Sequence, residues 1–411
     1  MSPLPNPPST VHRRADAPEL PRLLYVGDVP VESSYHGSAL LYRLLQDYPA
    51  DQLRIVETNL VRSLPERRLP GVAYAELHLG HPRPLYTRFA RGYRAWLTWR
   101  AAGRQRRLPS LLPGFRPQAV LTVTHGFAWR TAARFAAQHH LPLHLICHDD
   151  LPRLADLPVR FRGGLDREFR RVYRQAASRL CVSPFMRDAY RERYGAEGEV
   201  LYPSRAADCP DHAAPPGHLL ESKATLTGAY AGSINSEGYA RAVRQLAHGL
   251  AALGGRLLLF GPLRPDELQS RGLNLPNVIA GGLVPFRELI ERCRADADFL
   301  FVPMSFEPAD RPNMELSFPS KLTDYTASGL PLLIWGPPGC SAVRWVRDNP
   351  GVAELVETDE PAALLPALRR LGENPAHRFQ LAEQALALGR QFFSHAAGQR
   401  TFHHALGAAN H

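Results

Sequence analysis

The sequence predicts an α/β protein built from two doubly wound domains, each around a parallel sheet. Short apolar runs, typical of buried parallel strands, alternate along the chain with loops and helical segments. Residues 204–222, which are rich in proline, interrupt this alternation near the middle and are typical of a linker between domains. With 411 residues, the chain is long enough for two domains of ordinary size.

The first half of the chain is expected to form an N-terminal domain over residues 21–203. Residues 1–20 have four prolines in their first eight positions and are expected to form a disordered leader. The apolar run 23–26 ends in Gly27 and is followed by a loop and a helix, which is how such a domain begins. Further strands are predicted at 54–57, 119–123, 143–146 and 180–183, and helices at 39–45, 85–107 and 184–194.

The second half repeats the alternation and gives a C-terminal domain over residues 223–376, followed by C-terminal helices at 377–411. Between residues 361 and 411 we expect two helices, and between 304 and 315 an irregular loop. Strands are predicted at 227–231, 256–260, 278–282, 299–303 and 330–335, and helices at 238–253 and 286–294.

Composition restricts the class of protein. No run of about 18 apolar residues occurs, so no membrane-spanning helix is expected. Residues 1–20 also lack the apolar core of a signal peptide. The five cysteines are odd in number and form no CxxC pair, so we expect reduced thiols in a cytoplasmic protein and no zinc site.

The net charge of +10 is concentrated in one segment. Between Glu76 and Asp149 there is no acidic residue, but there are eleven arginines. The expected helix 85–107 combines arginines with aromatic residues, which favours an interfacial helix on anionic lipid through Arg88, Arg91, Arg94 and Trp96. The alternative is a domain helix with a solvated basic face. Nucleic-acid binding is not favoured, because no recognised motif accompanies the charge.

Two histidines follow predicted strands of the first domain. His125 comes after 119–123, and His148 and Asp149 come after 143–146. Because functional residues of open parallel sheets gather at the carboxyl ends of strands, both are candidates for a site. The alternatives are a capping role for His125 and a structural loop around His148. Metal ligation by the His-Asp-Asp run is a less favoured interpretation.

Residues 317–336 carry the clearest motif. Pro319 suits the first turn of a helix that Ser317 or Ser320 can cap, and a buried strand follows it. A helix N-terminus at the edge of a parallel sheet favours a phosphate, and Lys321 adds a full charge there. Asp324, one turn further on, can accept from sugar hydroxyls. The chain has 47 arginines and only two lysines, so a lysine here is not a consequence of composition. The alternative is an ordinary amphipathic helix before a strand.

The order Phe318 to Leu322, then Asp324-Tyr325, then Ala327 to Pro331 resembles the donor motif of retaining nucleotide-sugar glycosyltransferases of family four, which have the GT-B fold. The resemblance implies that the last helix crosses back onto the first domain, that no metal or other cofactor is needed, and that the donor's leaving phosphate deprotonates the acceptor. It also implies catalytic roles for His148 and Glu315. It implies donor contacts from Gly232, Ser233, Arg241, Val284, Pro319, Ser320, Lys321 and Asp324, and acceptor-side positions at Gly37, His125 and Asp149.

The chain departs from the family pattern in two places. Ser233 and Glu237 stand where many members have a basic phosphate ligand, and Leu316 stands where the first acid of a pair is expected, with Glu315 one residue away. The resemblance therefore predicts a retaining enzyme that moves a hexose-type sugar from a nucleotide diphosphate sugar to a glycan or lipid-linked acceptor. We expect it to act in bacterial polysaccharide or glycolipid synthesis, in the cytoplasm or at the inner face of the plasma membrane. The alternatives are a catalytically silent partner subunit with the same fold and a nucleotide-sugar epimerase.

Overall fold

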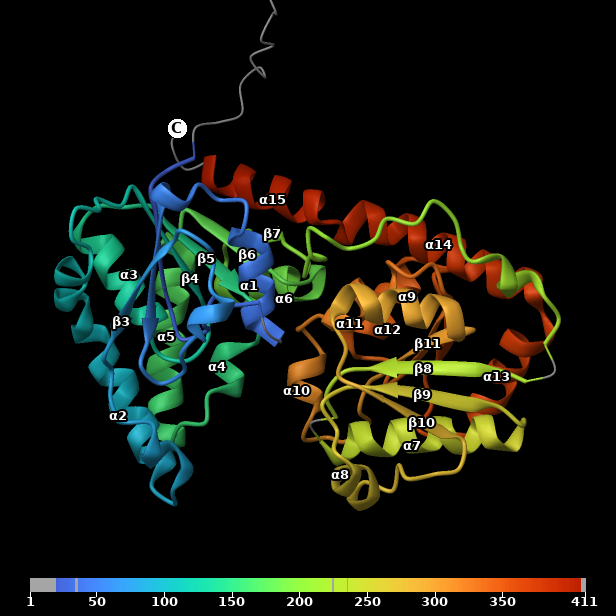
Figure 1. The fold of residues 1–411 in the computed structure, drawn as a ribbon. Helices are drawn as coiled ribbons and strands as arrows, with labels where there is room; N and C mark the ends of the chain where they lie inside the picture. Colours follow the sequence, from blue (N-terminus) through green and yellow to red (C-terminus); the bar gives the residue numbers. More distant parts are fainter. Residues whose placement is uncertain (1–19, 34–35, 224, 235, 408–411) are drawn as a thin grey trace, which may run out of the picture.

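The computed structural model describes residues 20–407 apart from residues 34, 35, 224 and 235. Two parallel α/β domains lie next to each other in it, as Figure 1 shows, and the predicted fold class is confirmed. The leader expected at residues 1–20 falls outside the described residues, apart from Leu20.

The N-terminal domain has a seven-stranded sheet in the order β3-β2-β1-β4-β5-β6-β7, and all of its strand pairs are parallel. The sequence did not indicate β3, whose side chains are largely exposed or half-buried, or β7, which has only two residues. The strands are β1 (Leu23–Gly27), β2 (Leu53–Thr58), β3 (Ala73–Leu77), β4 (Ala119–Val123), β5 (Leu143–Cys147), β6 (Ser178–Cys181) and β7 (Glu199–Val200).

Helices cover both faces of this sheet, which is why every residue of β1, β4 and β5 is buried. Leu23 and Tyr25 of β1 belong to a core shared with α1 and with Phe402 of the last helix. Leu24 and Val26 point to the opposite face and its larger core. The helices are α1 (His36–Leu45), α2 (Ala90–Gly103), α3 (Trp129–Gln138), α4 (Leu151–Leu154), α5 (Val159–Gln175) and α6 (Pro184–Tyr194), with short 3-10 turns η1 (Ala50–Gln52), η2 (Pro65–Arg67), η3 (Arg83–Tyr86), η4 (Arg104–Arg107) and η5 (Pro109–Leu111).

The single helix expected at 85–107 is wrong, because the structure divides it into η3, α2 and η4. Thr87 has an extended backbone, with φ −113° and ψ 169°. Its hydroxyl accepts a hydrogen bond from the N–H of Phe89, so the side chain satisfies a group that a continuous helix would have used. At the other end, α2 stops at Gly103, a residue type that disfavours a helix interior.

The C-terminal domain has a six-stranded parallel sheet in the order β10-β9-β8-β11-β12-β13. The loop expected at 304–315 contains a short helix, α10, and the helices α8 and α12 and the strand β13 were not predicted. The strands are β8 (Thr227–Ala231), β9 (Arg256–Phe260), β10 (Val278–Gly282), β11 (Phe299–Pro303), β12 (Leu332–Trp335) and β13 (Ala353–Val356). The helices are α7 (Glu237–Ala252), α8 (Pro265–Ser270), α9 (Phe286–Asp296), α10 (Arg311–Met314), α11 (Ser320–Tyr325), α12 (Ser341–Asp348) and α13 (Leu364–Glu373).

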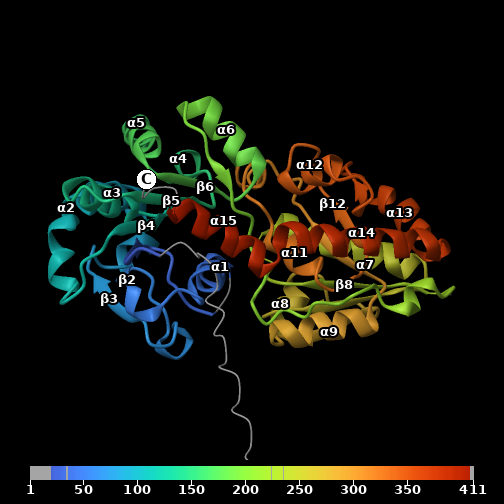
Figure 2. The same ribbon diagram turned by 90° about the horizontal axis from the view of Figure 1, so that it is seen from above.

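Three helices, not the expected two, follow residue 361: α13, α14 (Pro375–Phe393) and α15 (His395–Gly407). Asn374 starts α14 by accepting from the N–H of His377, so a new helix begins directly after α13. Seen from above in Figure 2, α14 and α15 run from the C-terminal domain to the N-terminal domain. There the amide of Gln399 donates to the backbone carbonyls of Arg43 and Leu44, which ties α15 to α1.

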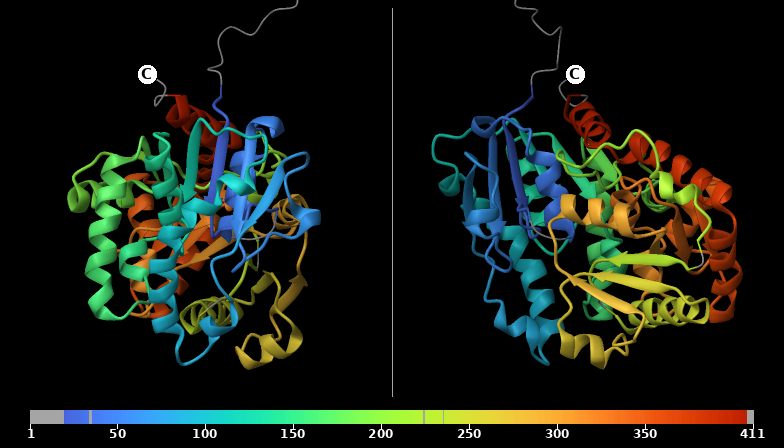
Figure 3. Two further views of the ribbon diagram at one scale, coloured as in Figure 1. Left: turned by 90° about the vertical axis from the view of Figure 1, so that its left-hand side faces the viewer. Right: turned by 45° about the vertical axis from the view of Figure 1, so that its right-hand side comes forward.

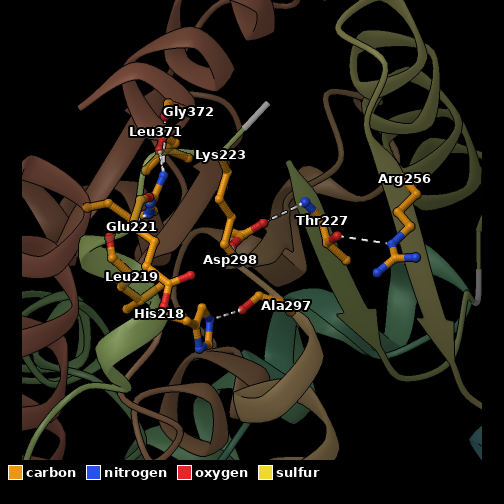
Figure 4. A network of polar contacts seen from close by, with 11 residues as sticks. His218, Leu219, Glu221, Lys223, Thr227, Arg256, Ala297, Asp298, Leu371 and Gly372 are labelled. Carbon is orange, nitrogen blue, oxygen red and sulfur yellow. Dashed lines mark hydrogen bonds and ion pairs between the residues drawn. The ribbon is translucent and has the colours of Figure 1, made fainter. Parts of the chain in front are cut away.

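The end of the proline-rich segment is fastened to the C-terminal domain (Figure 4). Lys223 pairs at 2.5 Å with the buried carboxylate of Asp298, which also accepts from the N–H of Thr227. The buried guanidinium of Arg378 donates to the carbonyls of Leu219, Glu221 and Leu371. A hollow of about 350 Å³ adjoins Lys223 and Asp298, which already neutralise each other.

Candidate functional site

A cavity of about 790 Å³ lies between the two domains. Its N-terminal wall is formed mainly by α1, with Ser33 and Arg67 beside it. Its C-terminal wall is formed by the loops after β8, β9 and β10 and by the start of α11. These loops meet because the strands are parallel, so their carboxyl ends share one edge of the sheet.

Gly232, directly after β8, allows the backbone to pass close to α11. Its φ is 137°, a conformation that residues with a Cβ rarely adopt. A Cβ at this position would lie 2.3 Å from the Cε atom of Lys321. Tyr325 of α11 holds the end of β8 close to α11, because its hydroxyl donates to the carbonyl of Ala231 and accepts from the N–H of Ala231.

Lys321 therefore stands in the cavity wall against the end of β8. Its Nζ atom lies 5.5 Å from the centroid of the Tyr230 ring. Burial lowers the pKa of Lys321, although the charge of Asp324 acts in the opposite direction. Lys321 takes part in no ion pair between described residues, whereas Lys223 is paired with Asp298. The cavity thus contains a desolvated ammonium group without a fixed counter-ion, which is suited to an anionic ligand.

Asp324 also lines the cavity, but it is already paired across the domain boundary. Its Oδ1 atom lies 3.0 Å from an Nη atom of Arg43 on α1. The guanidinium of Arg43 also donates to the carbonyl of Ser204 and lies 5.2 Å from the centroid of the Phe286 ring. Arg43 therefore connects α1, the segment between the domains and the C-terminal wall.

Sequence reasoning missed Arg43, although α1 carries a signal for it. Leu41, Leu44 and Leu45 of this helix are buried in the domain core. Leu40, Arg43 and Gln46, spaced three residues apart, form a second stripe that lines the cavity. An arginine in the middle of such a stripe, away from the buried leucines, could have indicated a second functional face of this helix.

The acceptor-side residues lie together where the two domains face each other. None of them is among the described residues that line the cavity. The Nδ1 atom of His125 is 3.5 Å from Asp149, whose other carboxylate oxygen accepts from the hydroxyl of Ser317 in the C-terminal domain at 3.1 Å. A Cβ on Gly37 would lie 3.7 Å from the Nδ1 atom of His148. The ends of β4 and β5 and the first turn of α1 thus bring Gly37, His125, His148 and Asp149 together.

The two histidines have opposite electrostatic environments. The hydrogen bond to Asp149 raises the pKa of His125, against the effect of burial. Burial lowers the pKa of His148 to about 4. Burial alone would raise the pKa of Asp149, but the hydrogen bond from His125 and the nearby histidine charges lower it overall. At neutral pH His148 is therefore uncharged, and Asp149 is ionised.

Asp28, which sequence reasoning did not single out, holds the loop that carries His125. Its buried carboxylate accepts from the N–H groups of Phe127 and Ala128 and from the hydroxyl of Thr58. Burial raises the pKa of Asp28 in spite of these hydrogen bonds. Gly126 has φ 60°, and a Cβ there would lie 2.6 Å from an Asp28 oxygen. A carboxylate directly after β1 could have drawn attention to this position.

The structure places three of the expected site residues elsewhere. Glu315 follows the last residue of α10 and pairs with Arg311, four residues earlier, at 2.9 Å, so it does not reach the cavity. Arg241 pairs with Asp359 at 2.9 Å, because its position on α7 faces the loop after β13. Pro319 precedes α11 and stays outside the wall. The other expected donor contacts line the cavity: Gly232, Ser233, Val284, Ser320, Lys321 and Asp324.

Two parallel-sheet α/β domains, with a cavity between them at the carboxyl ends of the strands, define the GT-B class of glycosyltransferase folds. Solved structures agree across nearly the whole chain. Anabaena Alr3699/HepE in complex with UDP and glucose is 14% identical, with a TM-score of 0.65, over 94% of this chain and 99% of that chain. Sucrose-phosphate synthase from Thermosynechococcus elongatus is 15% identical, with a TM-score of 0.61, over 92% and 97%. The apo form of the lipopolysaccharide outer core galactosyltransferase WaaB is 14% identical, with a TM-score of 0.60, over 93% and 98%.

The family is indicated by the N-terminal domain, where residues 63–203 match the model of Glycosyltransferase Family 4. The N-terminal domain is thus similar to glycosyltransferases of family four, and the chain as a whole has the GT-B fold. The resemblance found at residues 317–336 agrees with this match from the other half of the chain. No curated protein matches the chain.

Proposed function

We propose that this protein is a retaining glycosyltransferase that moves a hexose-type sugar from a nucleotide diphosphate sugar to a glycan or lipid-linked acceptor. The observation that carries the proposal is Lys321, which forms no ion pair with the described residues and stands in the wall of a cavity of about 790 Å³, beside the close approach at Gly232. HepE was solved with UDP and glucose, and WaaB is a galactosyltransferase of the lipopolysaccharide outer core. These neighbours support a uridine nucleotide donor and a role in polysaccharide or glycolipid synthesis.

Lys321 and the first N–H groups of α11 would neutralise the diphosphate as it leaves. Arg43 and Arg67 also line the cavity from the N-terminal domain. Both arginines would supply positive charge that Ser233 and Glu237 do not supply after β8. In this proposal the positively charged side chains that hold the diphosphate therefore come from both domains. They surround the phosphates only when both domains are in place around the cavity.

Asp324 would accept from the ribose hydroxyls, which requires Arg43 to share or release the carboxylate that it holds in the free protein. On the opposite side, His148 would contact the transferred sugar and the acceptor as a neutral hydrogen-bonding group, because its pKa is about 4. The leaving phosphate would deprotonate the acceptor hydroxyl. The proposal includes no resident metal ion or other cofactor.

A silent partner subunit is a second candidate, and one observation favours it. Glu315, the nearest substitute for the first acid of the family pair, is held by Arg311 outside the cavity. A protein of this kind would bind the nucleotide sugar and leave it intact.

Calorimetric titration with UDP, GDP, ADP and dTDP, followed by turnover of the matching nucleotide sugars, tests both candidates. We expect one nucleoside diphosphate to bind, and its sugar to be transferred, or slowly hydrolysed, with the anomeric configuration retained. Binding without any turnover would favour the silent subunit. Failure of all the nucleotides to bind would overturn the proposal.

A further inference from the structure

The exposed aromatic side chains gather at one end of the N-terminal domain. Among the described residues, every large exposed aromatic side chain belongs to η3, to α2 or its N-cap residue Phe89, or to the first turn of α5. The most exposed are Tyr86 at 87%, Trp99 at 75% and Phe89 at 66% of their surface. Burial of such side chains is strongly favoured, so this concentration indicates a surface that is covered by a partner.

Two segments far apart in the sequence form this surface. Arg91 and Arg94 of α2 both pair with Asp156, which precedes α5, at 2.9 and 2.7 Å. The start of α5 adds Val159, which is 80% exposed, and Phe161. Figures 1 and 3 show the first turns of α2 and α5 at the same end of the domain. We call residues 83–100 and 153–162 the basic-aromatic face.

The charge of this face is almost entirely positive. It carries eight arginines, and Asp156 is its one acid. Arg88 lies over the ring of Phe89, with 4.8 Å between its Cζ atom and the ring centroid, and Arg160 lies over Phe161 at 5.0 Å. Arginine next to an exposed aromatic ring suits the headgroup region of an anionic bilayer, where the ring enters the acyl boundary and the guanidinium meets phosphate.

The face borders the acceptor side of the cleft. Helix α4 directly follows His148, Asp149 and Asp150 and contacts α10 of the other domain. Leu154, at the end of α4, is exposed and lies within the face. A bilayer bound here would therefore lie next to the histidines of the interdomain face.

From these contacts we infer that the basic-aromatic face docks on an anionic lipid bilayer. The exposed aromatic side chains come from helix and loop positions and lie beside arginines, which suits insertion into a fluid interface better than a fit against a rigid acidic protein. In the described part of the chain no helix is long and apolar enough to cross a membrane. The docking is independent of the chemistry proposed for the cavity.

Sedimentation with vesicles of phosphatidylcholine, with and without phosphatidylglycerol, tests the inference in the absence of nucleotide. The wild-type protein is expected to sediment with the anionic vesicles at low salt and to dissociate as salt rises. Arg88→Gln combined with Arg160→Gln should lower the partition coefficient about thirtyfold. Replacing Phe89 and Trp99 by serine should give a loss that does not depend on salt.

Asp156→Asn tests whether the arginines of the face bind lipid, because replacing a residue that only supports the fold would not increase vesicle binding. Removal of the single acid frees Arg91 and Arg94 for lipid phosphate, so binding should rise about fivefold. The matched control replaces the exposed Arg369 and Arg400 by glutamine, which removes the same charge outside the face and should leave binding unchanged. Thermal melting shows whether each variant is folded. If the wild-type protein ignores anionic vesicles, or if the control loses as much binding as the Arg88 and Arg160 variant, the inference is overturned, and an acidic protein becomes the better partner for this face.

Discussion

Replacement of Lys321 by methionine should separate binding from stability, because the two effects have opposite signs. Methionine keeps most of the length of the side chain and removes the charge. We expect the variant to bind nucleoside diphosphate much more weakly and yet to resist unfolding at least as well as the wild-type protein. An ordinary structural lysine would not behave in this way.

The gain in stability follows from the desolvation of the ammonium group. Burial lowers the pKa of Lys321, so the unfolded chain holds this proton more tightly than the folded chain. The charged lysine therefore lowers the free energy of unfolding at neutral pH, and this penalty declines only between the folded-state pKa and the ordinary value of 10.5. Removal of an incompletely compensated charge of this kind should raise the free energy of unfolding by about 1 kcal/mol.

The loss of binding should be larger. A charge-assisted contact from a partly desolvated ammonium group to a phosphate oxygen contributes about 2 to 4 kcal/mol, judged from donors that stabilise oxyanions. The affinity for the bound nucleotide should therefore fall on the order of a hundredfold. Calorimetry measures this loss, and the midpoint of urea unfolding measures the change in stability.

The second lysine of the chain provides the matched control. Lys223→Met leaves the buried carboxylate of Asp298 without its ion pair, so it should lower the free energy of unfolding by about 2 kcal/mol and leave nucleotide affinity unchanged. If Lys321→Met instead destabilises the protein and keeps wild-type affinity, the assignment of Lys321 to a phosphate is refuted.

Three further variants test the rest of the site. Asp324→Asn should raise KM for the donor several-fold, because an amide accepts less strongly from ribose hydroxyls and because Arg43 loses its ion pair; an unchanged KM would remove Asp324 from the donor site. His148→Gln should lower kcat and spare nucleotide binding. The free energy of unfolding of the wild-type protein should fall as pH decreases from 6.5 to about 4, because the unfolded chain takes up a proton on His148 there before the folded chain does. The variant should lose less stability over this range; a pH-stability curve that matches the wild type would contradict the pKa argument. Gly232→Ala should weaken nucleotide binding at least tenfold, since its Cβ would meet the side chain of Lys321 at 2.3 Å. Wild-type affinity in calorimetry would mean that nucleotide binding does not need the backbone to pass so close to Lys321.

The sequence by itself determined the local structure wherever one pattern dominated. The buried strands β8, β9 and β11 and the helix α6 lie where their apolar runs and capping residues predicted them. Elements at the sheet edges gave weaker signals. The strand β3 is largely exposed or half-buried and β7 has two residues, so neither has the apolar run that a central parallel strand requires.

The sequence also identified most of the donor side of the candidate site. Ser320, Lys321 and Asp324 belong to one short motif, and their spacing along α11 brings all three to the cavity wall. Glu315 and Arg241 could not be placed in this way. Both are long, charged side chains whose direction depends on an available partner, and Arg311 and Asp359 supplied those partners outside the cavity.

Contacts between segments that are distant along the chain were decided only by the tertiary structure. The ion pair from Arg43 to Asp324 joins residues 281 positions apart, and the arginines of α2 meet Asp156 more than sixty positions away. Periodicity and motifs describe the surroundings of a residue within a few turns of the chain. They carry no information about which helix of one domain faces which loop of the other, because that pairing is fixed by how the two cores and the crossing helices α14 and α15 pack.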